Sequence, residues 1–120
     1  MKLQPLGPYS HVASAGNFIF CSGQIALDPM SKEIIKGGIT EQTRQVIRNI
    51  ESILRDVDSH LDHIIKTEVF LTDMDDFKEM NGVYAEMFVG TIKPARSTVE
   101  VSRLPKDALI EIACIAYKKV

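Results

Sequence analysis

Two side chains toward the end of the sequence have the chemistry of a small-molecule site, Arg96 and Glu111. Arg96 opens a short β-branched segment, and a guanidinium can hold a carboxylate through two parallel hydrogen bonds. Glu111 lies in a segment that is otherwise almost wholly apolar, where an ionised carboxylate is costly unless it is paired or used. Together the two residues suggest a small anionic substrate and an acid or base that handles water.

Both residues also have structural explanations, which their spacing leaves open. Arg96 could be a surface arginine paired with Glu100 on the same strand face, since such pairs are common and weak. Glu111 could be paired with a lysine or arginine of a nearby strand, or it could orient or deprotonate water in a pocket of low dielectric. Burial would raise the pKa of Glu111 and a neighbouring Arg96 would lower it, so the net direction stays open.

Five further residues lie in predicted loops or at the ends of predicted elements, where sites usually form. They are Tyr9, Ser22, Gly23, Asn81 and Pro105. Taken one at a time, each is more readily explained as structural than as functional.

Other polar clusters have simpler explanations than chemistry. His60-x-x-His63 with Asp62 could hold a metal, but a polar loop after the first predicted helix explains it better. The acidic cluster at 73–76 begins like a calcium loop but lacks the later Gly and Glu, so it is interpreted as a helix N-cap. The three histidines form no plausible triad with a serine or cysteine.

The composition fits one compact domain spanning residues 1–120, with 45% hydrophobic and 25% charged residues. The net charge of −2 argues against general nucleic-acid binding, which needs a concentrated basic face. Cys21 and Cys114 lie in apolar segments and are interpreted as core thiols. Two free thiols, no visible secretion signal and no apolar run of membrane-spanning length predict a cytoplasmic protein that does not bind membranes.

Hydrophobic periodicity predicts the element order β-β-α-β-α-β-β, an α+β fold with a mixed sheet. The predicted strands are 10–15, 17–22, 64–72, 96–101 and 108–117. The first helix is predicted to begin at the N-cap Thr40 and to continue to Leu61, and the second to follow Asp73 or Asp75 and to end at Gly90.

The strand faces predict an assembly of several copies. Residues on both faces of 108–117 are apolar, but two helices can cover only one face of a sheet. The opposite face would be a large exposed apolar patch unless another copy covered it. In the other strands, Ile65 is expected on the same face as Thr67 and Val69, and Val99 and Val101 are expected to point to the core.

Residues 94–107, Pro-Ala-Arg-Ser-Thr-Val-Glu-Val-Ser-Arg-Leu-Pro-Lys-Asp, followed by Ile-Glu-Ile at 110–112, closely resemble the signature of the Rid/YjgF family of enamine/imine deaminases. Segments 7–10, 20–25, 66–73 and 77–84 also resemble family segments. The resemblance covers nearly the whole chain. It implies a chorismate-mutase-like fold with two helices on one sheet face, assembled as a homotrimer with three sites in the clefts between subunits.

The resemblance also implies an activity, 2-iminobutanoate/2-iminopropanoate deamination. Such a hydrolase converts 2-aminoacrylate and 2-iminobutanoate to 2-oxo acids and ammonia, without a metal or organic cofactor. By position, Arg96 would clamp the substrate carboxylate and Glu111 would hold and polarise the attacking water. The residues that would line the pocket are Tyr9, Ser22, Gly23, Asn81, Thr98 and Pro105.

One position departs from the family pattern, and two other functions stay open. Thr98 stands where archetypal members often have cysteine, and it is expected to contact ligand or backbone. A non-catalytic sensor of 2-oxo acids or other small carboxylates would use the same Arg96. A ribonuclease or translation inhibitor, a role also attached to family members, is weaker, because the chain lacks a basic face and a histidine pair.

Overall fold

The computed structural model describes residues 5, 7, 10–90 and 92–119, and Tyr9 lies outside them. The described elements, in chain order, follow the predicted β-β-α-β-α-β-β pattern. They are β1 (Val12–Ala15), β2 (Phe18–Gln24), α1 (Ile39–Arg55), the short 3-10 helix η1 (Leu61–His63), β3 (Ile64–Leu71), η2 (Met74–Asp76), α2 (Phe77–Met87), β4 (Ala95–Glu100), η3 (Pro105–Asp107) and β5 (Ile110–Tyr117).

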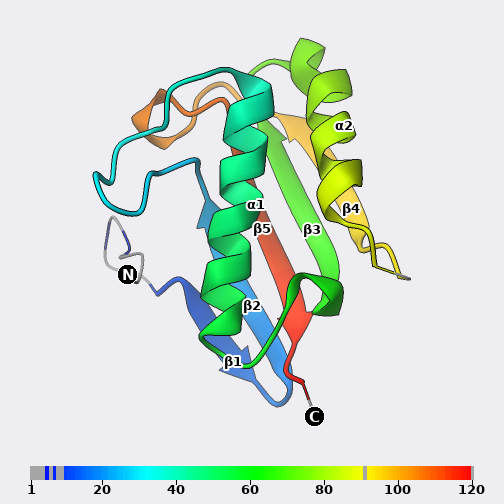
Figure 1. The fold of residues 1–120 in the computed structure, drawn as a ribbon. Coiled ribbons are helices and arrows are strands. Elements are labelled where there is room, and N and C mark those ends of the chain that lie inside the picture. The colour runs from blue at the N-terminus through cyan, green and yellow to red at the C-terminus, as the bar shows by residue number, and fades with distance from the viewer. Residues whose placement is uncertain (1–4, 6, 8–9, 91, 120) are drawn as a thin grey trace.

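The five strands form one sheet in the order β1-β2-β5-β3-β4. The edge pair β3–β4 is parallel and the other pairs are antiparallel, which confirms the mixed sheet. Both helices lie on the same side of this sheet (Figure 1). The register places Arg96 of β4 beside Thr67 of β3, and Glu111 of β5 beside Phe70 of β3.

Helix α1 begins and ends earlier than predicted. Its N-cap is Gly38 rather than Thr40, because the backbone N–H of Gly38 donates to the side chain of Glu41 at 2.7 Å. The helix ends at Arg55, so Leu61 lies in η1 and not in the helix. Helix α2 likewise ends at Met87, before Gly90. The acidic cluster caps η2 rather than α2, since Asp73 accepts from the N–H of Asp75. The N-cap of α2 is Asp76, which makes no side-chain capping bond, so the predicted capping of this helix by Asp73 or Asp75 is wrong.

The core lies between the helices and one face of the sheet. Ile110, Ile112 and Ala116 of β5 are fully buried there, together with the apolar stripe of α1. Cys21 and Cys114 are also buried, as free thiols. The opposite face is not covered by any part of the chain that the structure describes, and large apolar side chains stand exposed on it: Phe18, Phe20, Val99 and Tyr117.

Two predicted orientations are wrong, one in β3 and one in the edge strand β4. Ile65 is 40% exposed, because the register shifts between Ile64 and Lys66 and leaves Ile64 buried in its place. Val99 is 47% exposed on the uncovered face, because Arg96 and Thr98 of the same strand turn toward the helices.

A buried amide fixes the chain where it leaves β2. The side chain of Asn49 on α1 donates to the carbonyls of Ile25 and Leu27, at 3.4 and 3.0 Å. Asn49 is 3% exposed, so these bonds form away from solvent and are costly to lose. They hold the end of β2 against the helix, directly after the irregular part of the strand that carries Ser22 and Gly23.

Candidate functional site

Gly23 and Glu111 are in direct contact on the uncovered side of the sheet. The pairing of β2 with β5 shifts register between Cys21 and Gln24, so Ser22 and Gly23 form a bulge opposite β5. A methyl group on Gly23 would lie only 2.5 Å from Oε2 of Glu111. The φ of Gly23 is not in the left-handed region, so space rather than backbone conformation excludes a side chain.

The carboxyl of Glu111 has no cationic partner among the described residues. It is partly buried, and burial raises its pKa above the ordinary value. The structural alternative, a buried ion pair with a neighbouring strand, is therefore not what the described chain contains. A carboxyl of this kind can accept a proton or orient water, because no fixed counter-charge holds it in the ionised form.

Arg96 is held on the other side of the sheet, beneath α2. Its Nη1 donates to Oδ1 of Asn81 at 2.7 Å. Its guanidinium carbon lies 4.7 Å from the ring centroid of Tyr84 and 5.5 Å from that of Phe77. Contact with aromatic faces and one amide restrains the guanidinium while leaving other N–H groups able to bind an anion.

The aromatic support of Arg96 is itself anchored in the core. The hydroxyl of Tyr84 lies 2.7 Å from Oγ1 of the fully buried Thr67. Burial raises the pKa of Tyr84, so its phenol stays protonated and can donate or accept in this bond. The predicted alternative pairing of Arg96 with Glu100 does not form, because Glu100 accepts from the backbone N–H of Met74 at 2.7 Å.

Two more predicted site residues lie near these groups without completing them. Thr98 follows Arg96 on the same face of β4, and its Oγ1 is buried with no hydrogen-bond partner in the described chain. Pro105 begins η3 and is exposed, next to the buried Leu104. Phe70, the register partner of Glu111, packs against the apolar cluster that contains Leu104.

The predicted residues therefore form two separate groups. Gly23 and Glu111 lie together on the uncovered face, and Ser22 precedes Gly23 in the same bulge. Asn81 and Arg96 lie together on the helix-covered face, at the edge strand β4. Since the two groups occupy opposite faces of one sheet, a single copy does not bring Arg96 and Glu111 to the same ligand.

Phe77 and Tyr84 support Arg96, and neither is among the residues that the sequence predicted for the site. The signal that identifies them is their spacing from Asn81. Phe77, Asn81 and Tyr84 recur at intervals of four and three residues, which places them on one helix face. A polar residue flanked at this spacing by two aromatic residues is a pattern that suits a planar cation.

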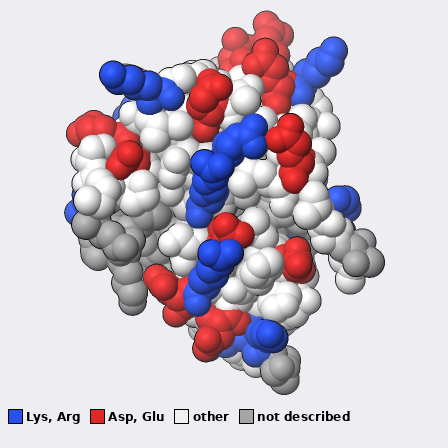
Figure 2. All heavy atoms as spheres, in the orientation of Figure 1, with Lys and Arg blue, Asp and Glu red and all other residues white. Residues whose placement is uncertain are grey.

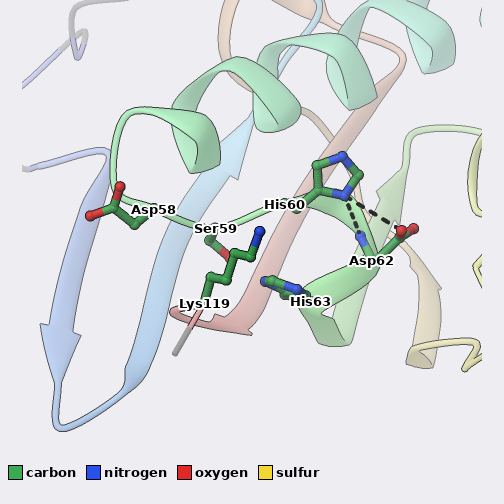
Figure 3. Close-up of a pocket in the computed structure, with 6 residues that line it drawn as sticks. All are labelled: Asp58, Ser59, His60, Asp62, His63 and Lys119. Atoms are coloured by element: carbon green, nitrogen blue, oxygen red, sulfur yellow. Dashed lines mark hydrogen bonds and ion pairs between the residues drawn. The ribbon is translucent and has the colours of Figure 1, made fainter.

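The polar loop at His60 is a different place in the molecule. A cavity of about 410 Å³ is lined there by Asp58, Ser59, His60, Asp62, His63 and Lys119 (Figure 3). Nδ1 of His60 accepts from the backbone N–H of Asp62 at 3.2 Å and so caps η1. No three metal-binding side chains are grouped in the described ranges, and the capping role of His60 fits the loop interpretation.

Charges on the helix-covered face are interleaved rather than segregated (Figure 2). Arg44 of α1 pairs with Glu86 of α2 at 3.1 Å, and Arg55 pairs with Glu51 at 3.4 Å. No helix in the part of the chain that the structure describes has the length and apolar character to cross a bilayer.

Comparison with known proteins identifies the family. The family model described as Endoribonuclease L-PSP matches residues 1–118. The chain belongs to the Rid/YjgF family. A RutC family protein of Pyrococcus horikoshii is 58% identical over 116 residues, which are 97% of this chain and 91% of that protein.

Two further Rid/YjgF relatives are a protein with a named activity and a protein with a crystal structure. The mouse 2-iminobutanoate/2-iminopropanoate deaminase is 37% identical over 113 residues, covering 94% of this chain and 83% of the mouse protein. The crystal structure of the yjgF gene product of E. coli has a TM-score of 0.91 and 38% identity, covering 98% of this chain and 94% of that one. These likenesses confirm the predicted family and α+β fold.

Substitution of Gly23 tests the contact with Glu111. In Gly23→Ala the new methyl group displaces the carboxylate, so any activity that depends on Glu111 should fall by about tenfold or more. The matched control is Gly82→Ala on α2, where nothing lies within 4 Å of an added methyl group. Gly82→Ala should keep full activity and gain up to about 1 kcal/mol of stability. Equal activity of the two variants would contradict the contact.

The raised pKa of Glu111 makes stability depend on pH in a defined direction. At pH values between the pKa of Glu111 in the unfolded chain and its higher pKa in the folded chain, the folded chain binds a proton that the unfolded chain has released. The free energy of unfolding therefore falls as pH rises through this interval. Glu111→Gln should therefore melt at a higher temperature than wild type at neutral pH, and the difference should shrink toward about pH 4. Calorimetry across this range checks it, with the exposed Glu68→Gln as control. A lower melting temperature for Glu111→Gln at neutral pH would contradict the prediction.

Proposed function

We propose that this chain is an enamine/imine deaminase, which hydrolyses small 2-imino acids to 2-oxo acids and ammonia. The observation that carries the proposal is the partly buried carboxyl of Glu111, which lies against Gly23 and has no cationic partner among the residues that the structure describes. The 37% identity to a mouse protein named as such a deaminase supports it. The closer Pyrococcus relative bears only a family name, so the substrate is inferred from the chemistry of the site.

The proposed reaction needs one anchor and one oriented water. The guanidinium of Arg96 binds the substrate carboxylate through N–H groups that Asn81 does not use. Glu111 accepts a hydrogen bond from water and directs its oxygen to the carbon of the C=N bond. The C–O bond forms as the water proton passes to nitrogen. The resulting carbinolamine then loses ammonia and leaves the 2-oxo acid. Because such imines hydrolyse readily unaided, positioning and one polarised water suffice.

The proposed active unit is a homotrimer whose sites lie between subunits. Arg96 and Glu111 face opposite sides of one sheet, so a cleft that contains both requires residues of two copies. The uncovered sheet face carries exposed Phe18, Phe20 and Tyr117, an apolar surface of the kind that subunit contacts bury. In this assembly Arg96 of one subunit meets Glu111 of the next.

A direct assay distinguishes catalysis from binding. Threonine and a dehydratase generate 2-iminobutanoate, and formation of 2-oxobutanoate is followed with and without this protein. The protein should accelerate formation of 2-oxobutanoate. Arg96→Lys should lose about tenfold to a hundredfold in rate, because lysine keeps the positive charge but cannot donate two parallel hydrogen bonds to a carboxylate. Arg103→Lys, an exposed arginine paired with Asp107, is the control and should keep full activity. Binding of 2-oxobutanoate without acceleration would favour the sensor alternative.

Mixing inactive variants tests whether the site is shared. Arg96→Ala and Glu111→Gln should each be inactive alone. After the two are unfolded together and refolded in equal amounts, random assembly should restore about a quarter of the wild-type activity, since a fourth of the clefts then combine an intact Arg96 with an intact Glu111. Analytical ultracentrifugation should give the mass of three chains. No recovered activity in a correctly assembled mixture would place both residues of a site in one chain.

A further inference from the structure

His11 and Gln24 form a polar clamp around the bulge that carries Gly23. Nε2 of Gln24 lies 3.1 Å from Nδ1 of His11 and 3.2 Å from both the carbonyl oxygen and Oγ of Ser22. The backbone N–H and the hydroxyl of Ser22 both donate to the carbonyl of His11, at 2.8 and 3.3 Å. Gln24 is only 6% exposed, so these hydrogen bonds form largely away from water, where the lower dielectric strengthens them.

These contacts determine which nitrogen of His11 carries the proton. The carbonyl of Ser22 can only accept, so the Gln24 atom that faces it must be the amide nitrogen, which donates. That same nitrogen faces Nδ1 of His11, so Nδ1 must be the acceptor and the proton must lie on Nε2. Nε2 of His11 is buried and has no partner in the described chain. The clamp therefore requires a neutral imidazole of one particular tautomer.

Resting on the proposed function, we infer that His11 is a positioning residue for the deaminase reaction. In its neutral Nε2–H form it fixes Gln24, and through Gln24 it fixes the Ser22–Gly23 bulge against which the Glu111 carboxyl lies. It acts by keeping Gly23 in place, so that the carboxyl of Glu111 aims at water from a constant position.

The position of the bulge explains why this clamp matters. Regular pairing of β2 with β5 stops at Cys21 and resumes at Gln24, so the ladder does not hold Ser22 and Gly23 on the β5 side. On the β1 side Ser22 is restrained by its bonds to His11 and Gln24, and Gly23 follows it directly in the chain. Without the His11 acceptor, Gln24 loses one of its three contacts and the bulge gains freedom. Gly23 then no longer defines one position for the Glu111 carboxyl.

The tautomer is testable in the wild-type protein without any assay of activity. Long-range proton–nitrogen correlation spectra should show His11 with an unprotonated Nδ1 and a protonated Nε2 at neutral pH. The amide of Gly23 should exchange with solvent faster in His11→Phe than in wild type. A protonated Nδ1 in neutral His11, or unchanged Gly23 exchange in a folded His11→Phe protein, would overturn the inference.

Kinetics separate positioning from general structural support. In His11→Phe, imine hydrolysis should slow on the order of tenfold, while 2-oxobutanoate binding, which depends on Arg96, should change less than about twofold. His11→Gln, whose amide oxygen can accept from Gln24, should recover most of the rate. His60→Phe, at a partly exposed loop histidine away from the bulge, is the matched control and should leave the rate unchanged.

The outcomes distinguish this inference from the proposed function. If wild type does not accelerate imine hydrolysis, the proposed function fails, and the tautomer and Gly23 exchange still decide whether the clamp exists. If wild type is active and His11→Phe is equally active, the positioning role is overturned while the deaminase proposal stands. Equal losses in His11→Phe and His11→Gln would also overturn it, since the acceptor would then be irrelevant.

Discussion

The Glu111 side of the molecule depends on the absence of a side chain at Gly23, whose place the Glu111 carboxyl occupies. A carboxyl of a mostly apolar strand can lie against backbone only where no side chain stands in its way. The bulge in β2 provides this place, and Asn49 of α1 secures the chain just beyond it. The result is a carboxyl that is partly removed from water and is not paired with a cation of the described chain, and its raised pKa follows from that burial.

On the other face of the sheet, the positively charged guanidinium of Arg96 is also held in a restrained position. It lies on the edge strand, where β4 runs parallel to β3, and α2 passes over it with two aromatic rings and one amide. The ring of Tyr84 is in turn held by the buried hydroxyl of Thr67. A guanidinium restrained in this way loses little further freedom when it binds a carboxylate, which favours recognition of small acids.

The alternation of a β-sheet separates these two groups. Adjacent residues of a strand point to opposite faces, and the strand register places Arg96 with the helices and Glu111 away from them. In the proposed trimer this separation is what makes the site a property of the assembly. The same sheet face that exposes Phe18 and Phe20 also carries Glu111, so the contact that would bury the apolar surface would also bring a second subunit to the carboxyl.

Much of the fold and the chemical types of the site could be predicted from the sequence, because they are local properties. Apolar periodicity predicted the order of strands and helices, and the apolar surroundings of Glu111 marked it as unusual. The N-cap at Gly38 was missed because the decisive contact comes from the side chain of Glu41, three residues along the chain. The role of Tyr84 was missed because an aromatic residue in an apolar stripe suits a core equally well.

The tertiary structure decided which face each residue occupies. The outward turn of Ile65 comes from a register shift against β5, and the outward turn of Val99 comes from pairing with β3. The contact of Gly23 with Glu111 joins segments almost ninety residues apart. Residue types and periodicity are properties of the local sequence, whereas bulges and strand registers depend on the competition between distant segments for the same backbone hydrogen bonds. The sequence by itself therefore determined which groups are available, and the pairing of the strands decided which of them meet.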